Sequence, residues 1–122
     1  MKVLLSIKPE FALKIFDGSK KYEYRRAIFK RGEVTTIVVY ASHPIKRVIG
    51  EFDIGDILYD EPQTLWIKTK DHAGITKKRF LEYFIDKAKG YAIMVKSTKI
   101  YDVPLPLDSF LISTPPQSFM YL

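Results

Sequence analysis

Hydrophobic and polar residues alternate with two different periods in the first quarter of the chain. Residues 3–7 place apolar side chains at every second position, which predicts a buried strand. Apolar residues then recur at three- and four-residue steps, which predicts a helix over residues 9–17. Gly18 follows the last apolar residue of that helix and suits a left-handed helix cap. Residues 20–26 alternate again and predict a short strand.

The middle of the chain predicts strand without intervening helix. β-Branched residues fill residues 35–41, which favours a central strand. An extended stretch follows over residues 45–58, in which Gly50 and Gly55 predict bulges or bends. Consecutive strands of this kind indicate antiparallel pairing.

Two helices and one more strand complete the pattern. A short helix is expected near residues 61–69, with Asp60 as its N-cap and Gln63 as the capping partner. Thr76 can cap a second helix, whose apolar stripe continues to Ala88. Residues 91–101 then read as a long strand. The whole order predicts an α+β, mainly β fold: a small β-barrel with two to three flanking helices.

Composition narrows the class of protein. The chain has 122 residues, which fits one domain over residues 1–122. It has no cysteine, and His43 and His72 have no companion at metal-ligand spacing, so we expect neither a metal nor another cofactor. The apolar run at the N-terminus is too short for a signal peptide or a membrane span, which predicts a cytoplasmic protein with no membrane partner.

Positive charge is concentrated in the first half of this basic protein. The formal net charge is +6, and residues 1–50 carry eleven Lys and Arg against four Asp and Glu. Residues 51–122 carry nine against ten. A basic region of this kind suits a phosphate-bearing partner, and a simple solvated basic surface is the alternative.

A G-x-K-x-x-E-x-R run formed by Gly18, Lys20, Glu23 and Arg25 carries the candidate chemistry. Glu23 and Arg25 are two residues apart, so on a strand they share one face, and the long stem of Lys20 can swing toward them. The set is either a structural ion network or the floor of a polar ligand pocket. In the second case Arg25 offers a rigid fork of donors and Lys20 a point charge.

The run resembles the signature of ASCH domains, which share a fold with the PUA domains of RNA-modifying proteins. Residues 5–12, 40–44, 48–52 and 115–119 are also similar to this family. The resemblance implies a PUA-like β-barrel of five or six strands, with the motif in a cleft between barrel and helix. Family members have been proposed to bind RNA in connection with transcription or translation, and a minority are enzymes.

The first hypothesis is therefore an RNA- or nucleotide-binding module linked to transcription or translation regulation. Lys20, Arg25 and Lys8 contact the anionic ligand, and Glu23 positions them. The RNA backbone is attracted by Arg26, Lys30 and Arg31. The full set of expected ligand-binding residues is Lys8, Gly18, Lys20, Glu23, Arg25, Arg26, Tyr40 and Ser42. A metabolite-sensing domain of a transcription regulator is a further possibility.

The alternative is a hydrolase that uses Lys20 and Glu23, either a modified-nucleoside amidohydrolase or a ribonuclease. Two departures count against the amidohydrolase. Those relatives carry threonine where this chain has Glu23, and glutamate before a helix where this chain has residues 71–74. A charged Glu23 is also expected to hold Lys20 in its charged form, which opposes base catalysis. For a ribonuclease, His72 is the candidate general base.

Overall fold

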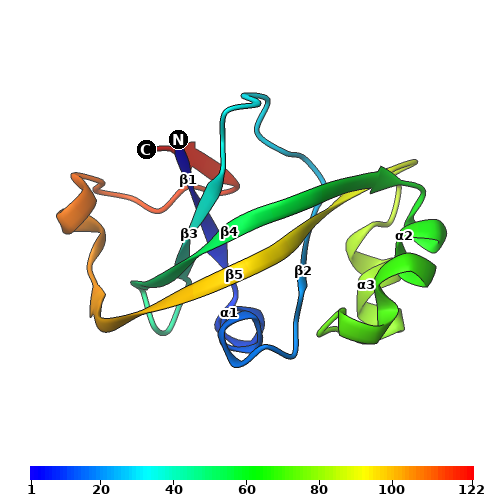
Figure 1. Ribbon diagram of the computed structural model, residues 1–122, viewed down its shortest axis with the longest axis horizontal. Coiled ribbons are helices and arrows are strands. Elements are labelled where there is room, and N and C mark those ends of the chain that lie inside the picture. The colour runs from blue at the N-terminus through cyan, green and yellow to red at the C-terminus, as the bar shows by residue number, and fades with distance from the viewer.

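The computed structural model describes all residues from 1 to 122 and contains one six-stranded sheet with three α-helices and two 3-10 helices (Figure 1). The strands are β1 (Lys2–Ile7), β2 (Tyr22–Arg25), β3 (Thr36–Ala41), β4 (Arg47–Asp60), β5 (Gly90–Leu105) and β6 (Phe119–Tyr121). The helices are α1 (Pro9–Asp17), α2 (Pro62–Thr69), η1 (Lys70–His72), α3 (Lys77–Tyr83) and η2 (Leu107–Phe110). No helix is both long and apolar enough to cross a bilayer.

The sheet is curled into a half-barrel with strand order β2-β5-β4-β3-β1-β6. β1 and β3 pair in parallel, and every other neighbouring pair is antiparallel. Figure 1 shows α2 and α3 together beside one end of the β4–β5 ribbon, while α1 lies near the lower end of β2. The predicted mainly β, PUA-like architecture with flanking helices is confirmed, and β2 and β6 form the two edges of the sheet.

Bulges in β4 produce much of the curvature. The pairing register between β4 and β5 shifts between Val48 and Gly50 and again between Ile54 and Ile57, which confirms the bends predicted at the two glycines. At Gly50 a Cβ atom would lie 2.6 Å from the carbonyl oxygen of Lys99 and 2.7 Å from the ring of Phe16. Only glycine permits the two strands and α1 to approach this closely.

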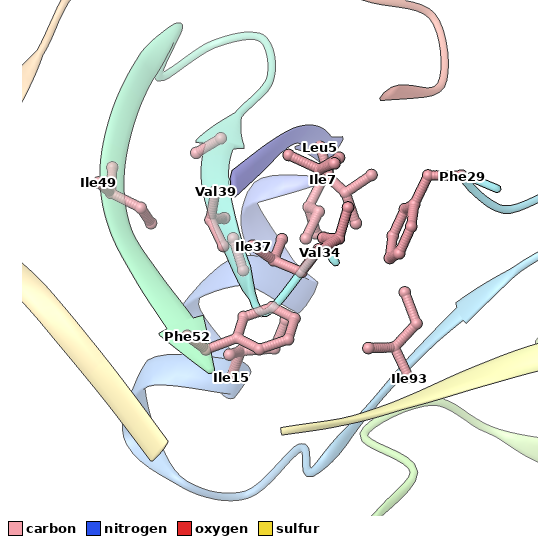
Figure 2. Close-up of a cluster of buried hydrophobic side chains, with 13 residues drawn as sticks. Leu5, Ile7, Ile15, Phe29, Val34, Ile37, Val39, Ile49, Phe52 and Ile93 are labelled. Atoms are coloured by element: carbon pink, nitrogen blue, oxygen red, sulfur yellow. The ribbon is translucent and has the colours of Figure 1, made fainter. Parts of the chain in front are cut away.

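Buried apolar side chains form a main cluster and two smaller ones. Figure 2 shows the main cluster, whose thirteen residues come from the concave side of the sheet, from α1 and from the segment between β2 and β3. The second cluster packs α2 and α3 onto the other side of β2 and β5, with the ring of Tyr24 edge-on to that of Phe80 at 4.8 Å. The face of β2 that carries Tyr24 is therefore buried beneath α2 and α3, which helps to hold this strand at the sheet edge.

The helix ends agree with the sequence in two cases and differ in two. Gly18 has φ 87° and its N–H donates to the Ile15 carbonyl, and the Thr76 hydroxyl accepts from the Arg79 N–H, as predicted. The expected Asp60 cap is wrong. Glu61 occupies the N-cap position, and Asp60 instead accepts a hydrogen bond from the Glu61 N–H.

The predicted extension of α3 to Ala88 is also wrong. The helix ends at Tyr83, and Asp86 adopts a left-handed φ of 61°, which breaks the helical path. Two residues of the apolar stripe expected for this helix are exposed: Leu81, which lies within α3, and Ile85, which lies beyond its end.

We predict that Gly50→Ala lowers the free energy of unfolding by about 1–3 kcal/mol, because the new methyl group overlaps a backbone oxygen that cannot move without disturbing the β4–β5 pairing. Gly32→Ala is the matched control, since nothing lies within 4 Å of its Cβ position, and its effect should stay within about 0.5 kcal/mol. Urea denaturation of both variants measures the difference. Equal stability of the two variants would contradict the proposed close approach.

Candidate functional site

A cleft of about 310 Å³ opens beside β2, where α1, β1, the loop before α3, the end of α3 and the C-terminal segment converge. Its volume is in the range of small-molecule sites. Charged, polar and aromatic side chains share its walls. The lining residues are Ser6, Ile7, Lys8, Phe11, Lys20, Glu23, Tyr24, Arg25, Ile75, Tyr83 and Gln117.

Lys20 is the most unusual residue of the cleft because its long charged side chain is only 2% exposed. Its Nζ donates a hydrogen bond to the Ala73 carbonyl oxygen at 2.6 Å. The same nitrogen lies 5.1 Å from the centre of the Phe11 ring and 4.7 Å from that of Tyr24. Rings at these distances attract a cation, and this partly offsets the loss of water.

Gly74 makes room for the buried stem of Lys20. A Cβ atom at Gly74 would lie 2.6 Å from the Cβ and 2.7 Å from the Cγ of Lys20, and the glycine has a positive φ of 64°. The loop between α2 and α3 thus holds Lys20 from one side and supplies its hydrogen-bond acceptor through Ala73.

Burial lowers the pKa of Lys20 to about 8, against the usual 10.5. The negative charge of Glu23 raises this pKa and the positive charge of Lys14 lowers it further, but both effects are smaller than the loss of hydration. Glu23 thus favours the charged form of Lys20, as expected, but it does not hold the pKa of the amine at its usual value. Lys20 forms no ion pair with Glu23, whose ionic partner is Arg25, and the amine can change its protonation state near pH 8.

Arg25 connects the elements around the cleft. Its Nη1 donates to the Ser6 carbonyl at 3.4 Å and to Glu23 Oε2 at 3.3 Å. Its Nη2 donates to the carbonyl oxygen of Ser118 at 3.0 Å and to the Ser118 hydroxyl at 3.3 Å. All four hydrogens on the two terminal nitrogens of the guanidinium thus have partners within the protein. Arg25 links β2 to β1 and to the segment that precedes β6.

Glu23 shares the face of Arg25, as the spacing predicts, and only 8% of its side chain is exposed. Its Oε2 accepts from Arg25, whereas its Oε1 has no hydrogen-bond partner in the protein. Because Glu23 lines the cleft, this oxygen is available to a bound molecule.

The structure brings four of the expected ligand-binding residues together and places the other four elsewhere. Lys8, Lys20, Glu23 and Arg25 line the cleft. The remaining four, Gly18, Arg26, Tyr40 and Ser42, are not part of its lining.

Each of those four has a structural contact of its own. Gly18 ends α1. Arg26 donates to the carbonyl oxygens of Tyr83 and Ile85 at 2.7 and 2.8 Å. Tyr40 is buried in the cluster beneath η2, and the Ser42 N–H donates to the carbonyl of Ile7.

Several lining residues are absent from the set that the motif suggests. Phe11, Ile75 and Tyr83 form apolar and aromatic walls, and Gln117 reaches the cleft from the C-terminal segment. Phe11 and Tyr83 lie on helices, where periodicity alone assigns aromatic residues to a core. Gly74, in the loop over residues 71–74, is the feature of the sequence that could have pointed to the pocket around Lys20. His72 is exposed and does not line the cleft, and no three His, Asp or Glu side chains converge as metal ligands do.

Comparisons with known proteins agree with this geometry. The model of the ASCH domain family matches residues 5–103. A curated relative, the ASCH domain-containing ribonuclease of Zymomonas mobilis, is 30% identical over 125 residues, and the match covers 99% of this chain and 84% of the relative. The crystal structure of ASCH from Zymomonas mobilis superimposes with a TM-score of 0.91 at 30% identity, covering 99% of this chain and 87% of that one.

Other curated relatives are considerably longer than the chain. ATP synthase subunit alpha of Ureaplasma parvum is 29% identical to it over 121 residues, and the large ribosomal subunit protein uL22 of the same species is 28% identical over 120 residues. The matches cover 98% of this chain in both cases, but only 15% and 39% of those proteins. The chain therefore spans a minor part of the length of these relatives.

We predict that Lys20→Met is at least as stable as the wild type at pH 7 and loses this advantage as the pH rises. A lysine whose pKa is lowered to about 8 in the folded state and stays near 10.5 in the unfolded chain destabilises the fold below pH 8. The wild type should gain up to about 3 kcal/mol between these two pKa values, because the unfolded state binds the extra proton there. Urea denaturation from pH 7 to 10 gives the free energy of unfolding of both proteins. Tyrosine ionisation affects both proteins alike, so it cancels in the difference between them. A difference that does not change with pH would show that Lys20 does not titrate in this range.

Proposed function

This chain is a member of the ASCH domain family, and from that premise we propose that it is an RNA-binding domain whose ligand occupies the cleft around Lys20. We propose further that residues 1–122 act as one domain and that RNA binding serves transcription or translation regulation. The name of the Zymomonas mobilis relative, a ribonuclease, supports RNA as the class of ligand.

The burial of Lys20 is the observation that carries the proposal. A lysine with 2% exposure and a single hydrogen bond at the floor of a cleft lowers the stability of the fold, because the ammonium has lost most of its water. Two of its three hydrogens have no acceptor in the protein. Such an arrangement is typical of binding and catalytic sites, where stability is given up for a reactive or ligand-binding group.

Exposed cations near the cleft supply the attraction for an RNA backbone. Lys8 lines the cleft and is exposed. Lys14 on α1 and Lys21 just before β2 are also exposed, although they do not belong to the lining. Arg79, in contrast, is engaged in a bidentate pair with Glu10. Exposed lysines without an acidic partner bind phosphates by displacing counterions, so their contribution depends strongly on salt.

We predict that affinity for a fluorescently labelled single-stranded RNA oligonucleotide falls steeply with salt. Lys8→Ala should weaken binding moderately and reduce the slope of log affinity against log salt by about one. Lys20→Met should weaken binding by about tenfold or more while the protein stays folded. Lys99→Ala removes an equal charge from an exposed position on β5, away from the cleft, and serves as the control. Fluorescence anisotropy measures all four proteins, and undetectable or salt-independent binding by the wild type would reject the proposal.

RNA cleavage is the second candidate, favoured by the name of the relative and by an amine that becomes neutral near pH 8. Neutral Lys20 would accept the proton of a ribose 2′-hydroxyl. The 2′-oxygen would then form a bond to the adjacent phosphorus while the bond from phosphorus to the 5′-oxygen breaks. The products are a 2′,3′-cyclic phosphate and a 5′-hydroxyl, whose proton comes from water because His72 lies outside the cleft.

The two candidates differ in the sign of their pH dependence. If Lys20 acts as a base, cleavage of labelled RNA should rise about tenfold per pH unit up to pH 8 and then level off. If Lys20 acts as a cation for binding, RNA affinity should decline above pH 8. Gel analysis of RNA incubated with wild type and with Lys20→Met from pH 6 to 9 measures the first case. Absence of cleavage products at every pH would eliminate the nuclease and leave the binding function standing.

A further inference from the structure

We propose that the floor of the cleft takes the hydrogen-bonding edge of a nucleobase and that the phosphate stays outside at the rim, an inference that rests on the proposed RNA binding. The key residue is Glu23. More than nine-tenths of its side chain is buried, it lines the cleft, and its Oε1 has no partner in the protein. A molecule that fills the cleft must satisfy this oxygen or leave a buried acceptor without a donor.

A phosphate group cannot satisfy that requirement. The oxygens of the phosphodiester groups that link an RNA chain are acceptors only, so a phosphodiester that reached Lys20 would bring negative charge toward the free oxygen of Glu23. Arg25 does not compensate for this repulsion. The hydrogens on its terminal nitrogens already bind Ser6, Glu23 and Ser118, so the forked contact by which arginine usually holds phosphate is not available.

A nucleobase edge matches the same floor. Lys20 presents N–H donors and Glu23 an acceptor, and the base-pairing edge of every nucleobase carries an acceptor directly beside an N–H donor. The base would therefore accept from Lys20 and donate to Glu23 at the same time. Neither contact requires the bound group to be charged.

The walls of the cleft suit the flat faces of a base. Phe11, Ile75 and Tyr83 contribute apolar and aromatic surface to the lining, and unpaired RNA bases commonly stack on such side chains. Lys8 is exposed at the edge of the same lining, where the ribose phosphate of a base inserted in the cleft would emerge. The cleft thus separates two tasks, with base recognition inside and phosphate attraction outside.

Competition on the wild-type protein tests this arrangement. Labelled single-stranded RNA is bound first, and then uridine, cytidine, adenosine, guanosine, ribose 5-phosphate or inorganic phosphate is added at equal concentration and constant ionic strength. We expect at least one nucleoside to displace the RNA at millimolar concentration, whereas ribose 5-phosphate and inorganic phosphate do not. Displacement by the nucleoside should persist at high salt, because no phosphate contact contributes to it.

Glu23→Gln provides the matched substitution, since it keeps the shape of the side chain and removes its charge. The variant should bind the competing nucleoside about tenfold more weakly or worse, because the N–H of the base loses its charged acceptor. Glu33→Gln removes a carboxylate from an exposed loop pair with Arg31 and should leave nucleoside binding unchanged. Thermal denaturation shows whether each variant is folded, and if Glu23→Gln is not, the wild-type competition alone decides.

The possible outcomes distinguish a failure of this inference from a failure of the proposed RNA binding. If the wild type binds RNA but inorganic phosphate or ribose 5-phosphate competes as well as the nucleosides, the inference is wrong and RNA binding stands. The same holds if no nucleoside displaces the RNA, or if Glu23→Gln binds RNA more tightly. If the wild type binds no RNA, the proposed function fails, and the inference fails with it.

Discussion

The guanidinium of Arg25 holds together the part of the molecule on which the cleft depends. The sheet is open between its edge strands β2 and β6, so no backbone ladder joins β2 to the far side of the half-barrel. Arg25 supplies that link through the carbonyl oxygens of Ser6 and Ser118, and the Ser6 hydroxyl adds a bond to the Pro116 carbonyl at 2.8 Å. The same guanidinium fixes Glu23, so the closure of the fold and the geometry of the cleft rest on one side chain.

Lys20, unlike Arg25, lowers the stability of the structure that contains it. Arg25 gains hydrogen bonds at every terminal nitrogen, whereas Lys20 gives up its water for one carbonyl and two aromatic rings. The loop between α2 and α3 accommodates it with a glycine that has no Cβ to collide with the lysine stem. Motif residues that look equivalent in the sequence therefore have different physical roles: Arg25 stabilises the site, and Lys20 is kept in it at a cost to stability.

Local patterns in the sequence predicted the elements and one face of the site. The helix over residues 9–17, its Gly18 cap and the shared face of Glu23 and Arg25 follow from periodicities of a few residues. The burial of Lys20 could not be predicted, because long charged side chains normally stay in water and its acceptor, Ala73, lies 53 positions away. The end of α3 was missed because the left-handed Asp86 leaves no signal in hydrophobic spacing.

The C-terminal segment shows why a motif alone underdetermines such a site. The family model matches residues 5–103, yet Pro116, Gln117 and Ser118 supply a partner for Ser6, part of the cleft lining and two acceptors for Arg25. These contacts join residues about a hundred positions apart, and no local pattern encodes them. Relatives that share the motif and differ in this segment can thus keep the fold of β2 while they change the wall that a ligand meets. Ligand preference within the family is therefore expected to vary with the C-terminal segment more than with the motif itself.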